Sequence, residues 1–271
     1  MKTLSRHLLL LSAVLLAAVP AGHSQPASPP PAAPTAAPVA LAARPVATTV
    51  PSEGNRKSHA AWYAACEQRV AAMQGKPCDI IFIGDSITDN FTAAPTPQWD
   101  LVGRAVWEQH YAGRNALNFG VGADRTEHVL WRLENMAIGA FRPKVAVILI
   151  GTNNNINAPA EIAAGVKAVV AKTQEKFAGV KIILVSILPN ARAPQKMEDA
   201  NRLIAPLGDD RTVYYFDLAS RMPKQGDTWK GLGRDRLHLS PEGYELWATE
   251  MEPLLTKLLA APVRDAGNAR G

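Results

Sequence analysis

The sequence predicts an α/β protein, a three-layer α/β/α sandwich with a five-stranded parallel sheet. Short apolar runs rich in β-branched residues alternate along the chain with longer segments of helical periodicity. Continuous apolar runs are typical of strands buried on both faces, which occur in parallel sheets covered by helices. Because only five such runs are present, an open sheet is favoured over a closed barrel.

The predicted elements follow in order along the chain. A first helix is predicted over residues 58–73, where Trp62, Cys66, Val70 and Met73 recur on one face. Strands are predicted at residues 79–83, 115–119, 144–150, 180–187 and 213–217. Later helices are predicted at the segment opened by Asp124, over residues 160–177, and from Ser240-Pro241 to about residue 259.

The ends of the chain differ in composition from its middle. Residues 1–24 have the layout of a secretory signal peptide, with Lys2 and Arg6 before an apolar stretch and small residues after it. A retained N-terminal anchor is the alternative. Residues 25–55 are rich in Pro and Ala and are predicted to form a disordered linker. The folded domain is expected at residues 56–262, followed by a disordered tail at 263–271.

Charge and cysteine content exclude several classes of function. Removal of residues 1–24 leaves 27 basic and 24 acidic residues, a net charge of +3. The basic residues are scattered and several lie beside acids, as in Arg132 and Glu134, so no nucleic-acid partner is expected. The two cysteines, Cys66 and Cys78, are too few for a zinc cage. They are expected either to form a disulfide or to be small buried hydrophobic residues.

Polar residues follow three of the predicted strands directly. Gly84-Asp85-Ser86 follows the first strand, Gly-Val-Gly-Ala-Asp at 120–124 the second, and Gly-Thr-Asn-Asn at 151–154 the third. In open parallel sheets, ligands bind beyond the carboxyl ends of the strands, so these segments predict one site. Ser86 is the candidate nucleophile, because Gly84 permits a tight turn after the strand. Taken alone, Gly-Asp-Ser is also common in ordinary turns.

His238 is the candidate general base for Ser86. It lies in a loop before the last helix, three residues after Asp235, which can accept a hydrogen bond from Nδ1 and leave Nε2 for the serine hydroxyl. The other histidines lie in the predicted signal peptide or in predicted helices: His7, His23, His59, His110 and His128.

Two strand ends offer donors for the oxyanion that forms during acyl transfer. The loop at 120–124 is predicted to open a helix, with Asp124 as N-cap and Glu127 completing a capping box, so that its backbone N–H groups are free. Asn153 offers a side-chain amide, although an Asn-rich stretch is also typical of a polar turn.

The four blocks, in this order, resemble the SGNH (GDSL-type) hydrolase superfamily. Residues 118–136 are particularly similar to the catalytic subunits of platelet-activating-factor acetylhydrolase isoform I and their bacterial relatives. The resemblance implies a flavodoxin-like fold and a catalytic triad of Ser86, Asp235 and His238. It also implies oxyanion donors at Ser86 N–H, Asn153 and the N–H of residue 123.

The family has glycine where this chain has Ala123. If that position needs a positive φ, alanine is strained there by about 1 kcal/mol or more. The alternative is that Gly122 supplies the flexibility of the loop.

The expected function is that of an exported serine esterase, periplasmic or secreted. It would hydrolyse short acyl esters, acetyl above all, on carbohydrate or cell-envelope polymer without metal or cofactor, and without stable membrane insertion after signal removal. Ile87 and Leu237 flank the nucleophile and base, where bulky aliphatics would crowd a long chain. Trp99, Trp107 and Trp229 are expected either to stack on sugar rings or to pack in the interior. The alternatives are a lipid-directed esterase (a lysophospholipase, thioesterase or phospholipid acetylhydrolase) and, from another class, a non-catalytic surface-binding module.

Overall fold

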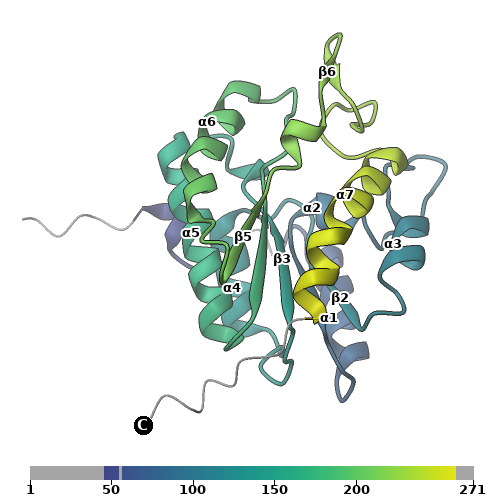
Figure 1. Cartoon of the computed structure of the whole chain (residues 1–271), viewed down its shortest axis with the longest axis vertical. Helices are drawn as coiled ribbons and strands as arrows, with labels where there is room; N and C mark the ends of the chain where they lie inside the picture. Colours follow the sequence, from purple (N-terminus) through teal and green to yellow (C-terminus); the bar gives the residue numbers. More distant parts are fainter. Residues whose placement is uncertain (1–45, 55–56, 261–271) are drawn as a thin grey trace, which may run out of the picture. The chain divides into compact units, whose positions relative to one another are not determined.

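The computed structural model describes residues 46–54 and 57–260. The predicted signal peptide, the linker up to residue 45 and the predicted tail lie outside the described residues. In the part that is described, five parallel strands form one sheet in the order β2-β1-β3-β4-β5 (Figure 1). Their bounds are β1 (Ile80–Gly84), β2 (Ala116–Gly120), β3 (Val145–Leu149), β4 (Lys181–Val185) and β5 (Val213–Phe216). This is the strand order of the flavodoxin-like fold, and the predicted fold class is confirmed.

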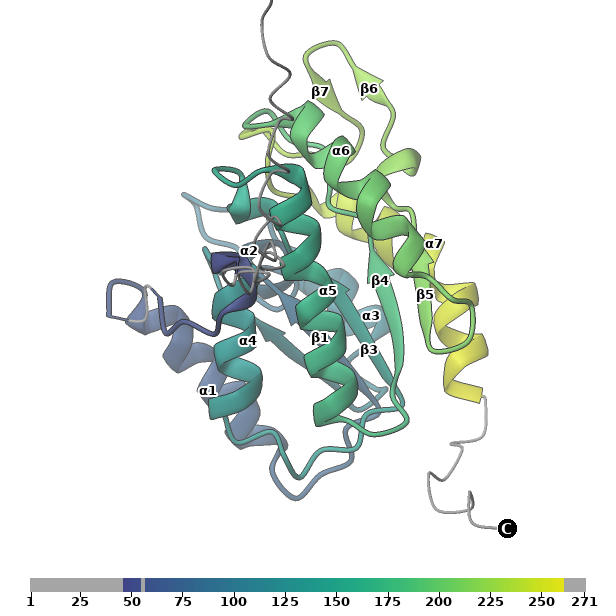
Figure 2. The same cartoon turned by 90° about the vertical axis from the view of Figure 1, so that its left-hand side faces the viewer.

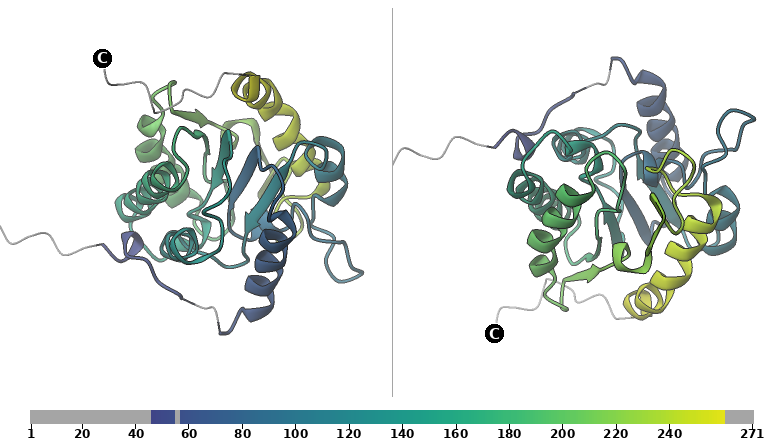
Figure 3. Two further views of the ribbon diagram at one scale, coloured as in Figure 1. Left: turned by 90° about the horizontal axis from the view of Figure 1, so that it is seen from below. Right: turned by 90° about the horizontal axis from the view of Figure 1, so that it is seen from above.

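Helices cover both faces of the sheet, which makes three layers (Figures 2 and 3). One apolar cluster joins the sheet to α1 (Ala60–Met73), α4 (Thr126–Asn135), α5 (Pro159–Lys176) and α6 (Pro194–Ile204). A second cluster joins the other face to α2 (Ser86–Asp89), α3 (Arg104–His110) and α7 (Pro241–Ala260). All five residues of β1 and of β3 are buried, as their continuous apolar runs predict.

The register of the strands places the candidate site residues side by side. Gly84 at the end of β1 pairs with Gly120 at the end of β2 and with Leu149 at the end of β3. The chain therefore leaves three neighbouring strands at the same level. Because β1 lies between β2 and β3, the segments that follow these strands meet at the point where the strand order reverses.

The described part of the chain already has structure before the expected boundary at residue 56. The short helix η1 (Ala47–Thr49) packs on α4 and α5. Thr48 is buried, its hydroxyl donates to the Glu161 carbonyl at 2.7 Å, and its own carbonyl accepts from the Thr126 hydroxyl at 2.9 Å. Gly165 lets this backbone approach α5, since a β-carbon there would lie 2.9 Å from the Thr48 carbonyl. Composition predicts a linker here because it cannot show that these residues contact α4 and α5, which lie far along the sequence.

The first helix differs from the prediction at one position of its buried face, since Cys66 and Val70 are buried as predicted and Met73 packs against the core. Tyr63, Cys66 and Val70 are buried, whereas Trp62 is 43% exposed. Tyr63 takes the inner position because its hydroxyl reaches the buried carboxylate of Asp124 at 3.1 Å. Cys66 and Cys78 are both buried free thiols, so the structure supports small buried hydrophobic residues over a disulfide. Burial raises the pKa of both thiols.

Several short elements were not predicted. They are α2, α6 and a hairpin of β6 (Lys224–Gln225) and β7 (Thr228–Trp229), together with the 3-10 helices η2 (Thr152–Asn154), η3 (Ala205–Leu207) and η4 (Ala219–Arg221). In α6 only Met197, Ala200 and Ile204 are buried, so its apolar stripe is thin for a sequence signal. In residues 46–54 and 57–260, no helix is both long and apolar enough to span a membrane.

Candidate active site

Ser86 lies where β1 turns into the short helix α2. The turn needs a residue without a β-carbon before it, because a β-carbon on Gly84 would lie 2.1 Å from the Thr88 hydroxyl. Asp85 caps α2: its Oδ1 accepts from the Ile87 N–H at 3.0 Å. Burial raises the pKa of the Asp85 carboxyl to about 7. The strand end and the cap together fix the backbone of Ser86 and leave its side chain partly exposed.

His238 and Asp235 complete a chain of hydrogen bonds from Ser86. Ser86 Oγ lies 2.8 Å from His238 Nε2, and His238 Nδ1 lies 2.6 Å from Asp235 Oδ2. Asp235 Oδ1 accepts from the backbone N–H of Leu237 at 3.1 Å and of His238 at 3.0 Å. Burial raises the pKa of Asp235, but the hydrogen bonds from His238 and the two backbone N–H groups outweigh it and hold the pKa below its ordinary value. An ionised Asp235 only accepts, so the ring proton lies on Nδ1 and Nε2 accepts from the serine hydroxyl.

Ala123 and Asn153 follow β2 and β3, the two strands that pair with β1 on its two sides. Ala123 has φ of 60°, whereas Gly122 is not among the residues with positive φ. The residue that adopts the left-handed conformation is therefore the alanine. The Asn153 side chain donates from Nδ2 to the Asp124 carbonyl at 3.0 Å and accepts at Oδ1 from Arg192 Nη1 at 3.4 Å. The amide of Asn153 is thereby held next to the Asp124–Arg125 peptide, one residue along the chain from Ala123.

The exposure pattern sets the predicted residues apart from their neighbours. Each of Ser86, Ala123, Asn153 and His238 is partly exposed, and the residues on both sides of each are buried: Asp85, Ile87, Gly122, Asp124, Thr152, Asn154, Leu237 and Leu239. Four segments far apart in the sequence thus each place one partly exposed residue between buried neighbours. A preorganised set of this kind suits charge stabilisation in acyl transfer.

A buried arginine, Arg132, joins the ends of two strands beneath this site. Its side chain is fully buried and donates to Asp124 Oδ2 at 2.7 Å, to the Phe119 carbonyl at 2.7 Å and to the Gly84 carbonyl at 3.1 Å. Burial alone lowers the pKa of Arg132, but the Asp124 carboxylate raises it above its ordinary value. Arg132 is thus a core residue, although in the sequence it is one of the scattered basic residues that lie beside acids.

The ion pair between Asp124 and Arg132 also explains why the helix predicted to open at Asp124 starts later. Asp124 does not cap α4, which begins at Thr126, because its carboxylate binds Arg132 instead. The side chain of Asn154 takes over the capping: its Oδ1 accepts from the Thr126 N–H at 3.1 Å and its Nδ2 donates to Glu127 Oε2 at 3.1 Å. In the sequence, the run of Asn residues after the third predicted strand is the feature that could have indicated this cap.

Comparison with known proteins decides the family. Residues 82–246 match the GDSL-like Lipase/Acylhydrolase family. The chain belongs to this family. As a GDSL-like (SGNH) hydrolase it is a serine esterase that acts on carboxylic ester bonds, and the resemblance inferred from the four sequence blocks is confirmed.

Relatives of this GDSL-like hydrolase include platelet-activating factor acetylhydrolase IB subunits. The human subunit alpha1 is 29% identical, with 73% of this chain and 84% of the relative covered. A Drosophila melanogaster subunit beta homolog is 36% identical over 53% of this chain and 59% of its own. Among solved structures, a putative acylhydrolase from Bacteroides fragilis shares the fold with a TM-score of 0.59 at 18% identity, covering 73% of this chain and 96% of its own.

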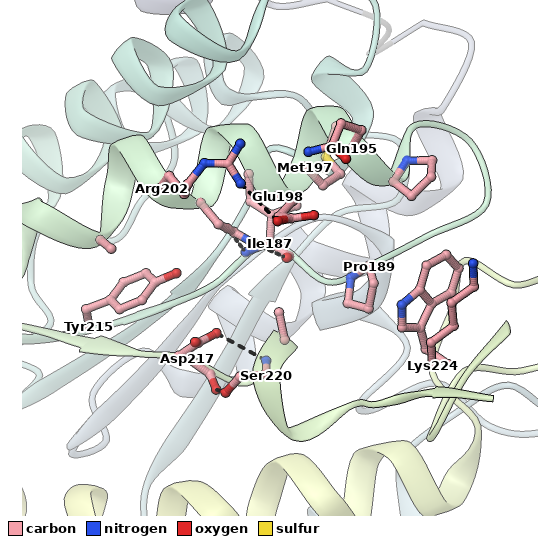
Figure 4. Close-up of a pocket in the computed structure, with 15 residues that line it drawn as sticks. Ile187, Pro189, Gln195, Met197, Glu198, Arg202, Tyr215, Asp217, Ser220 and Lys224 are labelled. Carbon is pink, nitrogen blue, oxygen red and sulfur yellow. Dashed lines mark hydrogen bonds and ion pairs between the residues drawn. The ribbon is translucent and has the colours of Figure 1, made fainter.

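A separate cavity of about 630 Å³ lies between α6, the end of β5 and the β6–β7 hairpin (Figure 4). Pro189, Asp217 and Trp229 are among its lining residues, and the catalytic candidates are not. Within the described residues, no group of three His, Cys, Asp or Glu side chains is arranged to hold a metal ion.

Two aliphatic residues of this esterase do not have the role expected of them. Ile87 is 1% exposed and packs in the core cluster with Phe91 and Tyr244. Leu237 is 5% exposed. Because both are buried beneath the site rather than around its opening, they give no reason for a limit on acyl length.

Replacing Ala123 by glycine is expected to raise the free energy of unfolding by about 0.5–1 kcal/mol. Left-handed backbone costs a non-glycine residue roughly 1–2 kcal/mol, and the extra freedom of glycine in the unfolded chain offsets part of the gain. Urea unfolding measures the change. Ala94→Gly is the matched control, since Ala94 is exposed and has no positive φ, and it should lower stability. A loss of stability in Ala123→Gly equal to the control's would contradict the strain.

Proposed function

We propose that this esterase removes short acyl groups, acetyl above all, from carbohydrate or cell-envelope polymer outside the cytoplasm. The observation that carries the proposed chemistry is the continuous hydrogen-bonded chain from Ser86 through His238 to Asp235. A serine beside an imidazole, itself oriented by a carboxylate, is the arrangement that activates a hydroxyl for acyl transfer.

In the proposed mechanism, Ser86 Oγ attacks the ester carbonyl carbon while His238 Nε2 accepts the hydroxyl proton. The carbonyl oxygen becomes an oxyanion that is held by the N–H of Ser86, the N–H of Ala123 and the Asn153 amide, which turns from the Asp124 carbonyl toward it. His238 then gives its proton to the oxygen of the leaving alcohol, and an acyl-serine remains. Water, deprotonated by His238, then attacks the acyl-serine. His238 returns that proton to Ser86 Oγ as the bond to the acyl group breaks, and the carboxylic acid is released. Asp235 stabilises the imidazolium in both steps.

The preference for acetyl rests on the relatives. Those of 29–36% identity are described as acetylhydrolases, enzymes that remove an acetyl group. The same relatives make a lipid-directed esterase the second candidate, since their described substrate is platelet-activating factor. A non-catalytic binding module is disfavoured, because Ser86, His238 and Asp235 lie at hydrogen-bonding distance.

Export is proposed from residues 1–24, which lie outside the described residues. Their basic start, apolar stretch and small residues are typical of a cleaved secretory signal. Mass spectrometry of the mature protein from its own host should find an N-terminus near Gln25. A protein that begins at Met1 and stays with the cytoplasmic fraction would contradict export.

A series of p-nitrophenyl esters from acetate to palmitate tests acyl length. We expect kcat/KM to be greatest at acetate or propionate and to fall at least about tenfold by C8, because each extra methylene needs apolar wall that a short-acyl site does not offer. The Ser86→Ala protein supplies the background rate. A maximum at C8 or longer would support the lipid-directed alternative instead.

A further inference from the structure

Trp99 lies directly against the candidate base. Its indole meets the His238 imidazole edge-on, with ring centroids 5.1 Å apart and an interplanar angle of 85°. Trp99 is partly exposed and belongs to the loop between α2 and α3. Of the three tryptophans considered as sugar platforms, it is the one that contacts a catalytic candidate.

The position of Trp99 is fixed by contacts to the catalytic loop. Arg234, the residue before Asp235, forms an ion pair with Asp100 and donates from Nη2 to the Gln98 carbonyl at 3.2 Å. Trp99 itself is held in a tight turn, because it exchanges backbone hydrogen bonds of 2.7 and 3.1 Å with Thr96. The indole is therefore attached to the segment that carries the base.

The chemistry of ester cleavage decides which part of the substrate lies beside Trp99. His238 Nε2 gives its proton to the leaving oxygen, so that oxygen must come within about 3 Å of the imidazole. In the proposed mechanism the carbonyl oxygen is held instead by the N–H groups of Ser86 and Ala123 and by the Asn153 amide. The alcohol portion of the ester therefore leaves past His238, and the exposed part of the Trp99 ring adjoins it.

The surroundings of Trp99 suit a sugar alcohol. An indole offers a flat apolar surface with a large contact area, and a pyranose ring presents a face of C–H groups to it. Hydroxyl groups at the rim of that ring need hydrogen-bonding partners. Asp100 and Arg234 supply these, with side chains 64% and 57% exposed. An alkyl chain in the same place would displace water from this ion pair without offering it a hydrogen bond, at a cost in binding free energy.

The other two tryptophans do not have this placement. Trp107 is 8% exposed and packs against Phe82 and Phe91 in the core. Trp229 lines the separate cavity beside the hairpin, with Lys224 Nζ 5.8 Å from its ring centroid. Trp107 is thus a core residue, and Trp229 provides a partly exposed control away from the base.

We propose that Trp99 forms the alcohol-side subsite of this esterase and stacks on the pyranose ring that bears the acyl group. The inference rests on the proposed function, since it names the part of the site that would select a carbohydrate ester. It assigns to Trp99 a role in substrate choice rather than in bond cleavage.

Two acetyl esters that differ in the alcohol alone test the subsite in the full-length enzyme. Trp99→Ala should lower kcat/KM for acetylated xylo-oligosaccharide, mainly through KM, at least about tenfold more than it lowers kcat/KM for triacetin. Trp99→Phe should retain most of the activity on the sugar ester, since a ring remains. Trp229→Ala should leave both substrates unchanged. An equal loss on both esters would show that Trp99 only supports His238 and would overturn the subsite.

A binding measurement separates this inference from the proposed function. Calorimetry of the Ser86→Ala protein with xylohexaose should show binding that is lost when Trp99→Ala is added. If Ser86→Ala binds xylohexaose no better than the double variant, the subsite is overturned while acetyl-ester hydrolysis stands. If the wild-type enzyme hydrolyses long-chain esters in preference to acetyl esters, the proposed function fails, whatever the binding result.

Discussion

Replacing Ser86 by alanine is expected to lower kcat for p-nitrophenyl acetate by at least about 10⁴-fold, because no other group would then form the acyl-enzyme. Stability should change little, since Ser86 is partly exposed and its Oγ makes one hydrogen bond, to His238, worth about 1 kcal/mol. Stopped assays of hydrolysis, corrected for the rate without enzyme, measure the loss. Thermal unfolding of the same preparation shows that the fold is intact.

The other members of the chain make the test sharper. His238→Ala should lose nearly as much activity as Ser86→Ala, and the double variant should lose no more than either single one, because the residues act as a unit. Ser220→Ala, at an exposed serine away from the site, is the matched control and should retain full activity. Losses that multiply in the double variant, or a Ser86→Ala protein with more than about a tenth of wild-type kcat, would refute the assigned roles.

The sequence predicted the sheet and the residues at its strand ends well, for a physical reason. Strands buried on both faces must be apolar throughout, and a parallel sheet brings all their carboxyl ends to one edge. Polar residues placed there stand out against the apolar runs that precede them. Ser86 and His238 are 152 positions apart, yet they meet because one follows β1 and the other precedes α7 at that edge.

Contacts between side chains that are far apart in the sequence could not be predicted from it. The left-handed conformation of Ala123 depends on the path of its loop. At the start of α1, Tyr63 is buried where Trp62 was predicted to be. Arg132 shows the limit most clearly. An arginine in a helix is usually solvated, and its burial here depends on an acidic partner and two strand-end carbonyls from other segments. The feature of the sequence that could have indicated its burial is the spacing of three residues from Val129, which places both on the buried face of α4.

Replacing Arg132 by methionine is expected to lower the free energy of unfolding by about 3–5 kcal/mol. Methionine fills much of the volume, but the Asp124 carboxylate then loses its buried cation, and the carbonyls of Phe119 and Gly84 lose their bonds from the guanidinium. For a domain of this size, the melting temperature should fall by roughly 10 °C. Arg202→Met is the matched control: Arg202 pairs with Glu198 on the surface of α6 with 60% of its side chain exposed, and its loss should cost less than about 1 kcal/mol.

Two further variants separate charge from geometry at Arg132. Asp124→Asn in the Arg132→Met background should restore part of the stability, because the unpaired buried charge is removed. Arg132→Lys keeps the charge, but one ammonium group lacks the planar fork that reaches three acceptors, so β1 and β2 are held less firmly under Ser86 and Ala123. We therefore expect Arg132→Lys, assayed well below its melting temperature, to show a lower kcat with little change in KM. Full kcat in that variant would mean that Arg132 stabilises the fold without positioning the site.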